Sequence, residues 1–517
     1  MKENNFFSKY LFIALALSTY PVTILYTSNF QNTNLFMYII PLGIVYLFTT
    51  IVYSIFYLLR NKLGLINYPF ASIIVSIFFF TYGIYYSFLS SQTNFLGLLS
   101  SHRFLLPIIV IIIIGLTYLL NKINKTSVKY NFLLIFLITL NLTPFINLVD
   151  KIFIDYKNLH NNVTAVNNYS FKDAPNIYFI ILDGYGSENS IKSFLKYDNS
   201  QFYNQLKEIG FRVQDNAVSN YNRTSFSLSS TLNLNYINRI IKSDIYYKDL
   251  ERYISHNKVA KILKSYGYSY YFFDSGFGLK KTEKNEFLIN TKENYYTDLF
   301  FSSSDNDLLN VFLNNSAFKI FKNPFFSDFI ISNYAYKVLN VYKKLPSIAK
   351  NNKKKFVFAH VISPHPPFLF NKSGKIGMYG IDNENEGVGW NEKLYIEQLK
   401  YINFKTIILL NKIIKNDKKN KIILIQGDHG SRCKINNKKF LNKENWVNEQ
   451  FHILNAIYIS KNDNSKRKIY ENWNYSSVNT FRIIFNEYFK SNYSNLKDVK
   501  YYSDLHEPYN FIQIKKK

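Results

Sequence analysis

Five apolar spans in the first 150 residues constrain this chain more than any other feature. Each is close to the ~20 residues that a helix needs to cross a bilayer. The first span lacks a small-residue cleavage site and four more follow it, so we interpret it as an anchor and not a signal peptide. The sequence therefore predicts an α-helical membrane domain over residues 1–150, with transmembrane helices at about 10–26, 35–59, 67–90, 104–120 and 132–149.

Basic residues predict the orientation of this domain, because loops rich in lysine and arginine face the cytoplasm. Most of them lie on one side of the predicted membrane: before the first span, between the second and third, and between the fourth and fifth. These residues are Lys2, Lys9, Arg60, Lys62, Lys122, Lys125 and Lys129, whereas the loops on the opposite side contain only Arg103. We expect a multi-pass protein of the cell membrane with a cytoplasmic N-terminus. An odd number of spans then places everything after residue 150 outside. The spans hold almost no ionisable residues, which disfavours a transporter.

The net charge of +27 has two interpretations. One is attraction to anionic lipid or an anionic surface polymer. The other, which we favour, is a codon bias that enriches Lys, Asn, Ile, Tyr and Phe together. Nucleic acid is not an expected partner, because the lysines are scattered and the chain begins as a membrane protein. The single cysteine, Cys433, excludes an internal disulfide and says little about the compartment.

Beyond a polar, aperiodic stretch at 151–174, which predicts a linker, strands alternate with helices. This alternation predicts an extracytoplasmic α/β domain over 175–517, with a mostly parallel sheet and helices on both faces. Expected strands cover 176–182, 268–274, 355–362, 421–426 and 452–459, and expected helices cover 199–209, 225–233, 256–265, 393–416 and 477–488. We interpret residues 275–350 as an irregular insertion that helps to shape a substrate cleft.

Polar side chains follow two of these strands directly. Asp183 and a glycine end PNIYFIILDG, and Asp428 and His429 end KIILIQGDH. Ligands of open α/β sheets bind just beyond the carboxyl ends of strands. Carboxylate oxygens and an imidazole nitrogen suit a divalent metal. The alternative is that each is an ordinary polar turn.

Thr224, in SNYNRTSFSLSS, stands where an extended segment becomes a predicted helix. A free hydroxyl is a poor nucleophile and needs activation. A divalent cation and the N-terminus of the following helix would both favour its alkoxide form. The alternative is an ordinary N-cap threonine, and the neighbouring Ser225 and Ser227 offer competing hydroxyls.

Four further residues are possible members of the site. His365 is followed by two prolines, which restrict the backbone around its imidazole. His360 lies on the preceding strand, and we favour a core role for it. Arg432 has a phosphate or a nearby carboxylate as alternative partners. His452 stands before a strand, where a strand-edge role is slightly favoured over a place in the site.

The chain order of an acid, a threonine and then Asp-His resembles the alkaline phosphatase/sulfatase superfamily. It is most similar to the membrane-bound branch that includes lipoteichoic acid synthases and phosphoethanolamine transferases. The resemblance covers roughly residues 175–490, through four short motifs in the same order. Five spans followed by an external domain also resemble the layout of lipoteichoic acid synthases.

This resemblance implies an alkaline-phosphatase-like fold and a role for each motif. It makes Thr224 the nucleophile and places one divalent ion, Mn²⁺ or Zn²⁺, on Asp183, Thr224, Asp428 and His429. His365 matches a histidine that binds the substrate phosphate in lipoteichoic acid synthases. Those enzymes carry Glu where this chain has Asp183, so the exact substrate does not carry over.

Two absences refine the expected chemistry. The nucleophile stretch NRTSFS lacks the C/S-x-P-x-R motif that sulfatases oxidise to formylglycine, so sulfate ester hydrolysis is not expected. No clear second Asp/His set is present, which favours a single-metal site.

The sequence therefore predicts a membrane-anchored, metal-dependent phosphotransferase. It would move a phosphoglycerol or phosphoethanolamine-type group from a phospholipid donor to a surface glycan or lipid, through a phosphothreonine intermediate. The close alternative is an extracytoplasmic phosphodiesterase or phosphatase, which uses the same intermediate. A catalytically silent membrane scaffold is a third interpretation, and the intact set of four ligands argues against it.

Overall fold

The computed structural model describes most of the chain outside 123–173. The described residues are 11–28, 35–62, 64, 67–90, 101–122, 174–241, 250–273, 275, 286–289, 312–313, 315–321, 324–379, 390–433, 448–460, 466–471, 473–504 and 507–514. They form two compact units, each of which contains two stretches of the chain. The first joins Met1–Thr164 with Tyr296–Phe326, and the second joins Ala165–Tyr295 with Ser327–Lys517. The predicted boundaries at 150 and 174 remain predictions.

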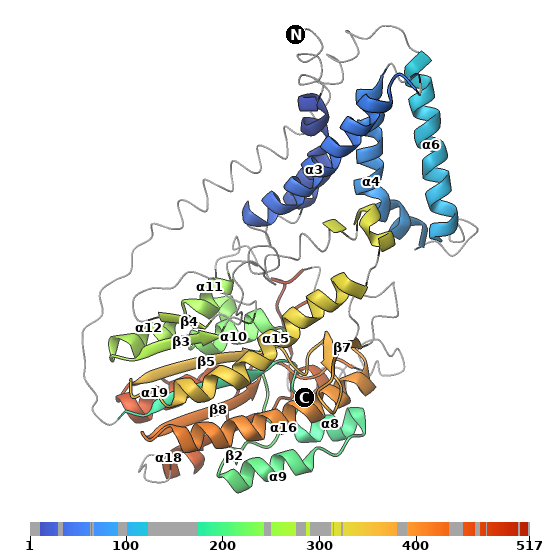
Figure 1. The fold of residues 1–517 in the computed structure, drawn as a ribbon. Helices are drawn as coiled ribbons and strands as arrows, with labels where there is room; N and C mark the ends of the chain where they lie inside the picture. The colour runs from blue at the N-terminus through green and yellow to red at the C-terminus, as the bar shows by residue number, and fades with distance from the viewer. Residues whose placement is uncertain are drawn as a thin grey trace. The chain divides into compact units, whose positions relative to one another are not determined.

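Four helices of the first unit are α2 (Tyr20–Ser28), α3 (Leu35–Leu59), α4 (Tyr68–Ser90) and α6 (His102–Lys122) (Figure 1). Three of them are long and apolar enough to cross a membrane, over Tyr38–Leu59, Tyr68–Tyr86 and His102–Leu119. The first predicted span contains a shorter apolar helix, Leu11–Tyr26. The fifth, 132–149, lies outside the described residues.

Apolar side chains remain exposed on these helices, as expected for surfaces that face lipid. Leu58 of α3 is 74% exposed and Ile111 of α6 is 68% exposed. A short 3-10 helix, η4 (Ala317–Phe321), packs against α4 within the same unit: the Phe318 and Phe79 rings meet edge to face at 5.0 Å.

A seven-stranded sheet organises the second unit, with the order β2-β9-β8-β1-β5-β3-β4. Its strands are β1 (Asn176–Leu182), β2 (Arg212–Val213), β3 (Ser269–Phe273), β4 (Glu286–Ile289), β5 (Lys355–Val361), β8 (Lys421–Gly427) and β9 (Asn455–Ile459). β1 pairs in parallel with both β5 and β8, whereas β9 is antiparallel to β8 and to β2. The prediction of an α/β domain with a mostly parallel sheet is confirmed.

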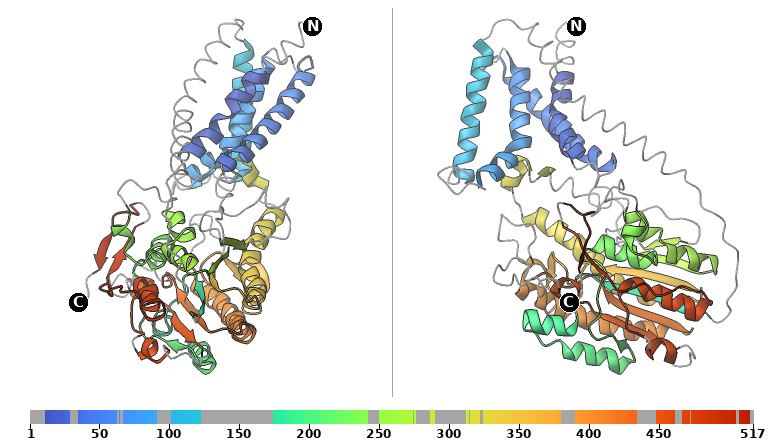
Figure 2. Two further views of the ribbon diagram at one scale, coloured as in Figure 1. Left: turned by 90° about the vertical axis from the view of Figure 1, so that its left-hand side faces the viewer. Right: turned by 180° about the vertical axis from the view of Figure 1, so that it is seen from behind.

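Helices cover both faces of this sheet (Figures 1 and 2). One face packs against α8 (Glu188–Leu195), α9 (Ser200–Ile209), α15 (Pro324–Ala349) and α16 (Glu392–Asn416). The other packs against α10 (Thr224–Leu232), α11 (Leu250–Ser255), α12 (Lys258–Ser265), α18 (Lys466–Glu471) and α19 (Thr480–Phe489). β1 is buried throughout, because successive side chains enter opposite cores: Tyr178 and Ile180 join the first, Ile177 and Phe179 the second.

The interpretation of 275–350 as irregular is wrong where the structure describes this segment. It contains the edge strand β4 and the 26-residue helix α15. The face of α15 that packs on the sheet repeats at helical spacing through Ala335, Val338, Tyr342, Leu345 and Ala349. Polar residues between these positions, and Pro346 inside the helix, concealed the pattern. Two short hairpins, β6 (Phe368–Phe370) with β7 (Ile376–Tyr379) and β10 (Lys500–Tyr502) with β11 (Ile512–Ile514), lie outside the main sheet.

Candidate metal centre

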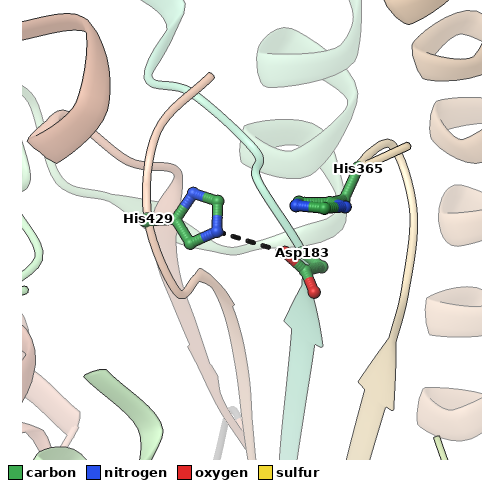
Figure 3. A group of neighbouring side chains, drawn as sticks. All are labelled: Asp183, His365 and His429. Carbon is green, nitrogen blue, oxygen red and sulfur yellow. Dashed lines mark ion pairs between the residues drawn. The ribbon is translucent and has the colours of Figure 1, made fainter. Parts of the chain in front are cut away.

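The carboxyl ends of three neighbouring parallel strands bring the predicted residues together. Asp183 follows β1, and Asp428 and His429 follow β8. In the strand register Leu182 lies opposite both Gly427 and Val361, so β1, β8 and β5 end at one level. His365, in the loop after β5, turns towards Asp183 and His429 (Figure 3). Asp183, Asp428 and His429 are almost fully buried, whereas His365 is partly exposed.

Each acid has one oxygen held by the protein and one oxygen without a partner. Asp183 Oδ2 lies 3.1 Å from His360 Nε2, and Asp428 Oδ1 accepts a hydrogen bond of 2.9 Å from the Gly184 N–H. Within the described part of the chain, buried Asp183 Oδ1 and Asp428 Oδ2 have no hydrogen-bond partner. A buried carboxylate oxygen without a partner is costly, so this arrangement fits a cation between the two acids.

The His429 imidazole faces the same two oxygens. Its Nε2 lies 3.4 Å from Asp183 Oδ1 and 3.6 Å from Asp428 Oδ2. Its Nδ1 lies 2.8 Å from the Gly430 carbonyl, which identifies Nδ1 as the protonated nitrogen that donates there. The Nε2 lone pair is then directed at the carboxylates. A lone pair and two anionic oxygens that face one another form a ligand set for a divalent metal.

Burial and mutual charge support this protonation pattern. Burial lowers the pKa of His429 to about 3, with Arg432 as a further cause, and burial also lowers the pKa of His365. Burial and then the Asp183 charge raise the pKa of Asp428 to about 6. Burial opposes ionisation of Asp183 too, but His365, His360 and His429 outweigh it and lower its pKa. Neutral imidazoles beside two crowded acids are available to a metal without first losing protons.

Two overlapping ligand groups can be drawn at this centre. One comprises Asp183, His365 and His429, and the other Asp183, His360 and Asp428, with the ligand atoms of each group within 4.8 Å of one another. Asp183 belongs to both. The structure therefore brings together Asp183, Asp428 and His429, the two acids and the histidine predicted for the metal site, with His365 and His360 beside them.

Thr224 is the first residue of α10 and is 9% exposed. Its side chain interacts with the Asp428 carboxylate and lowers the pKa of that acid. The hydroxyl therefore lies beside the proposed metal ligands and at a helix N-terminus, where the helix dipole favours negative charge. Ser225 and Ser227 are buried on the same helix.

His360 is buried as the core interpretation expects, yet it also belongs to the site. Its Nε2 donates to Asp183 Oδ2 at 3.1 Å, and its Nδ1 accepts from the Ser275 hydroxyl at 3.0 Å. The Asp183 carboxylate, which only accepts, thus fixes the tautomer of His360 with the proton on Nε2, and the Ser275 hydroxyl supports it by donating to Nδ1. Sequence reasoning missed Ser275, because it lies in the segment interpreted as an insertion.

The loop glycine of the Asp183 motif has a specific role. Gly184 has φ +68°, donates its N–H to Asp428, and accepts a hydrogen bond of 2.9 Å from the Tyr395 hydroxyl. A Cβ at this position would lie 2.8 Å from Cη2 of Trp390. The Asp-Gly pair therefore orients both acids while the glycine leaves room for an aromatic ring.

Arg432 and His452 differ in their relation to the centre. The Arg432 guanidinium donates to the Asn222 carbonyl, and its charge lowers the pKa of both His429 and His365. His452 takes part in a backbone bridge with Val218. No described hydrogen bond joins its imidazole to Asp183, Asp428 or His429, which agrees with the strand-edge interpretation.

Replacing His452 with asparagine is expected to reduce the acid sensitivity of the fold. Burial, and then Lys500, lower the pKa of His452 to about 4, below its ordinary value of about 6.5. The folded state therefore binds fewer protons than the unfolded state, and His452 costs stability as pH falls from 6.5 towards 4. Urea unfolding at pH 7.5 and at pH 4.5 measures the free energy of unfolding. Between these two pH values it should fall less for His452→Asn than for the wild type. An equal loss would contradict the predicted contribution.

Trp390 was not predicted, although it forms part of the site. Its ring lies 4.9 Å from the His365 ring and 6.3 Å from the His429 ring. It stands two residues before α16, whose Tyr395 contacts Gly184. The only sequence signal was the rarity of tryptophan, with three in the chain.

The fluorescence of Trp390 is expected to report metal binding. Titration of the metal-free protein with paramagnetic Mn²⁺ should quench tryptophan emission, because this indole lies beside two histidines of the centre. Most of the quenching should disappear in Trp390→Phe. Trp473→Phe, which changes a core residue, should retain it. If Mn²⁺ quenched the emission of Trp390→Phe as strongly as that of the wild type, the proposed position of the metal beside Trp390 would be wrong.

Comparison with known proteins identifies a family for this chain. A family model described as Sulfatase matches residues 175–484, more than half of the chain. No curated protein matches the chain significantly.

Solved structures with a similar fold have low sequence identity. The lipooligosaccharide phosphoethanolamine transferase EptA from Neisseria meningitidis is 12% identical, with a TM-score of 0.39 over 92% of this chain and 94% of that one. The periplasmic domain of EptC from Escherichia coli is 11% identical, with a TM-score of 0.41 over 68% and 96%. That of the phosphoethanolamine transferase EptC from Campylobacter jejuni is 13% identical, with a TM-score of 0.38 over 63% and 94%.

Proposed function

We propose, from the premise that this chain belongs to the sulfatase family, that it is a membrane-anchored, metal-dependent phosphotransferase that reacts through Thr224. The family match confirms the prediction of a sulfatase-like hydrolase or transferase. One observation carries the proposal: Asp183 Oδ1 and Asp428 Oδ2, buried and without a hydrogen-bond partner among the described residues, face the His429 Nε2 at 3.4 and 3.6 Å. Thr224, at the start of α10, lies close enough to Asp428 to lower the pKa of that acid. A nucleophile and a ligand set thus lie together.

The ligands in this proposal are Asp183, Asp428, His429 and Thr224, and the ion is Mn²⁺ or Zn²⁺. A bound divalent cation would polarise a phosphoryl oxygen and favour the alkoxide form of the nearby hydroxyl. Two carboxylates and one neutral imidazole carry enough negative charge to hold such an ion but do not select between the two metals.

In the first step, Thr224 Oγ attacks phosphorus of a phospholipid headgroup. A P–O bond to Thr224 forms and the P–O bond to the lipid glycerol breaks. The Thr224 hydroxyl releases its proton as this bond forms, and one proton is returned to the oxygen that leaves. The departing glycerol oxygen gains a proton and leaves as the lipid alcohol.

In the second step, an acceptor hydroxyl attacks the phosphothreonine and Thr224 regains a proton. His365 is partly exposed beside Asp183, and its Nδ1 lies 2.6 Å from the Pro366 carbonyl, to which it donates. Its Nε2 can therefore take up the proton of the attacking hydroxyl and then, as an imidazolium, donate a hydrogen bond to a phosphoryl oxygen. Arg432 adds positive charge near both histidines. Water in place of the acceptor gives the alternative, hydrolysis.

The membrane helices support a lipid donor. Three helices long and apolar enough to cross a membrane precede the α/β unit in the chain, so the enzyme would reside where phospholipid is the most abundant phosphodiester. A surface glycan or lipid is the proposed acceptor. The extracytoplasmic placement rests on the distribution of basic residues and remains part of the proposal.

Intact-mass and peptide mass spectrometry test this function directly. The purified full chain in detergent is incubated with Mn²⁺ and a mixture of bacterial phospholipids, beside Thr224→Ala. We expect an added phosphoglycerol or phosphoethanolamine mass on Thr224 that is absent from the variant. Bound metal without an adduct would point to a different donor or a short-lived intermediate. No adduct and no bound metal would favour the silent scaffold.

A further inference from the structure

The C-terminal hairpin contacts the segment that leads to Thr224. β10 and β11 pair antiparallel and lie side by side in the left view of Figure 2. Tyr501 of β10 forms a parallel bridge with Tyr221, and its N–H donates to the Asn220 carbonyl at 2.8 Å. The Tyr221 and Tyr501 rings stack with centroids 5.5 Å apart. The end of the chain thus forms an added strand beside the residues that precede the nucleophile.

Asn222, two residues before Thr224, is the centre of this contact. Its Oδ1 accepts from the Ser503 N–H at 3.0 Å, and its Nδ2 donates to the Ser503 carbonyl at 3.3 Å and to Gln450 Oε1 at 3.2 Å. Its own carbonyl accepts from Arg432. Asn222 is 3% exposed, so these bonds form in a setting where an unmade bond is costly.

Arg223 makes the entry to α10 unusual. It is the N-cap residue, with φ −133° and ψ 138°, and its side chain makes no capping bond. Helices usually begin with Ser, Thr, Asp or Asn, whose own oxygen sets the direction of the first turn. Here the Arg223 Nε donates instead to the Ser503 carbonyl at 3.0 Å. The C-terminal segment therefore fixes a backbone direction that the helix does not fix for itself.

Aromatic packing extends the contact into the first turn of α10. Phe226 lies two residues after Thr224 and is fully buried. Its ring meets Phe511 at 4.9 Å and Tyr509 at 5.8 Å, both edge to face. Residues on both sides of Thr224 are thus held by the last part of the chain.

We infer that residues 499–503 are a positioning element of the active site and that Asn222 is a positioning residue for Thr224. The inference rests on the proposed role of Thr224 as nucleophile. Three of the four proposed metal ligands, Asp183, Asp428 and His429, stand on other loops, after β1 and β8. The C-terminal segment therefore controls the orientation of the nucleophile and contributes little to metal affinity.

The test is Asn222→Asp in the full chain, with bis(p-nitrophenyl) phosphate and Mn²⁺ as probes. The aspartate keeps the acceptor for the Ser503 N–H but loses the amide that donates to the Ser503 carbonyl and Gln450. We expect kcat and the rate of the p-nitrophenolate burst to fall by roughly 10- to 100-fold, as for a small misplacement of a reacting group. KM should not change, and Mn²⁺ affinity should fall only slightly, because Asp183, Asp428 and His429 remain in place.

Asn479 provides a matched control. Its Nδ2 donates to the Leu496 carbonyl at 2.8 Å and its Oδ1 accepts from the Leu496 N–H at 2.9 Å, the same pair of bonds to the C-terminal segment but remote from Thr224 in the chain. Asn479→Asp should lower the melting temperature and leave kcat and the burst unchanged. Equal losses of kcat in the two variants would overturn the inference, as would wild-type kcat in Asn222→Asp.

Thr224→Ala separates failure of this inference from failure of the proposed function. Activity retained by Thr224→Ala would contradict the nucleophile itself. Loss in Thr224→Ala together with wild-type kcat in Asn222→Asp would contradict only the positioning role. If Asn222→Asp does not fold, Gln450→Ala removes a single acceptor of the same side chain. Gln450→Ala should also lower kcat, and an unchanged kcat would overturn the inference.

Discussion

Replacing Thr224 with alanine is expected to lower kcat by roughly 10⁴- to 10⁶-fold, the range seen when a covalent nucleophile or its partner is removed. The hydroxyl that would form the phosphothreonine is absent, and nothing else in the first turn of α10 can replace it from the same position. The measurement is phosphodiester turnover by the full chain with Mn²⁺. Metal affinity should fall only slightly, because Asp183, Asp428 and His429 remain.

Thr224→Ser is the control for this result. It keeps the hydroxyl and removes only a methyl group, so it should recover much of the activity and the burst of leaving group. Ser225→Ala, one residue further along the helix, should retain both. If Ser225→Ala lost activity and Thr224→Ala retained it, the nucleophile would be the neighbouring serine, Ser225.

Replacing Asp428 with asparagine is expected to stabilise the metal-free protein and to abolish its stabilisation by metal. In the metal-free wild type, two buried acids and the His429 lone pair face one another, and burial with the Asp183 charge raises the pKa of Asp428. An amide removes one charge and can donate to Asp183 Oδ1 or His429 Nε2. In the wild type, Mn²⁺ at 100 times its dissociation constant should add about 2.7 kcal/mol to the free energy of unfolding. Thermal unfolding with and without Mn²⁺ measures both effects.

Asp417 supplies a matched buried acid without a metal role. It is 3% exposed, and its Oδ2 accepts from the Tyr178 hydroxyl at 2.6 Å and from Asn176 Nδ2 at 2.8 Å. The Lys419 N–H donates to its other oxygen, Oδ1, at 3.0 Å. Asp417→Asn should lose about 1–3 kcal/mol of the free energy of unfolding, because an amide has one oxygen and cannot accept at both positions, and it should keep the full Mn²⁺ response. A metal-free Asp428→Asn that is less stable than the wild type, or that still responds to Mn²⁺, would contradict the two-acid site.

Local pattern was sufficient to predict the elements that carry the site. The strand expected at 176–182 is β1, and those expected at 421–426 and 355–362 are β8 and β5, to within one residue. These strands are buried on both faces, so they appear in the sequence as short apolar runs that stop at a polar residue. The same rule placed the acids at the sheet edge, because parallel strands end together.

Pattern failed where burial is one-sided or pairing is irregular. α15 buries a single face between polar residues and was taken for an insertion. β9 begins at Asn455 and not at residue 452, because His452 and Ile453 leave the ladder to form isolated bridges with Val218 and Gly186. In both cases a neighbouring segment, remote in the chain, decided the outcome.

The sequence alone determined which stretches are apolar enough for a membrane, which strands are buried, and which acids and histidines stand at strand ends. These properties depend on local spacing. Only the tertiary structure decided which carboxylate oxygens lack a partner, that His360 joins Asp183 across 177 residues, and that Ser503 holds Asn222 across 281 residues. Such contacts join segments that no local period relates, and their energies depend on burial that exists only after the chain has folded.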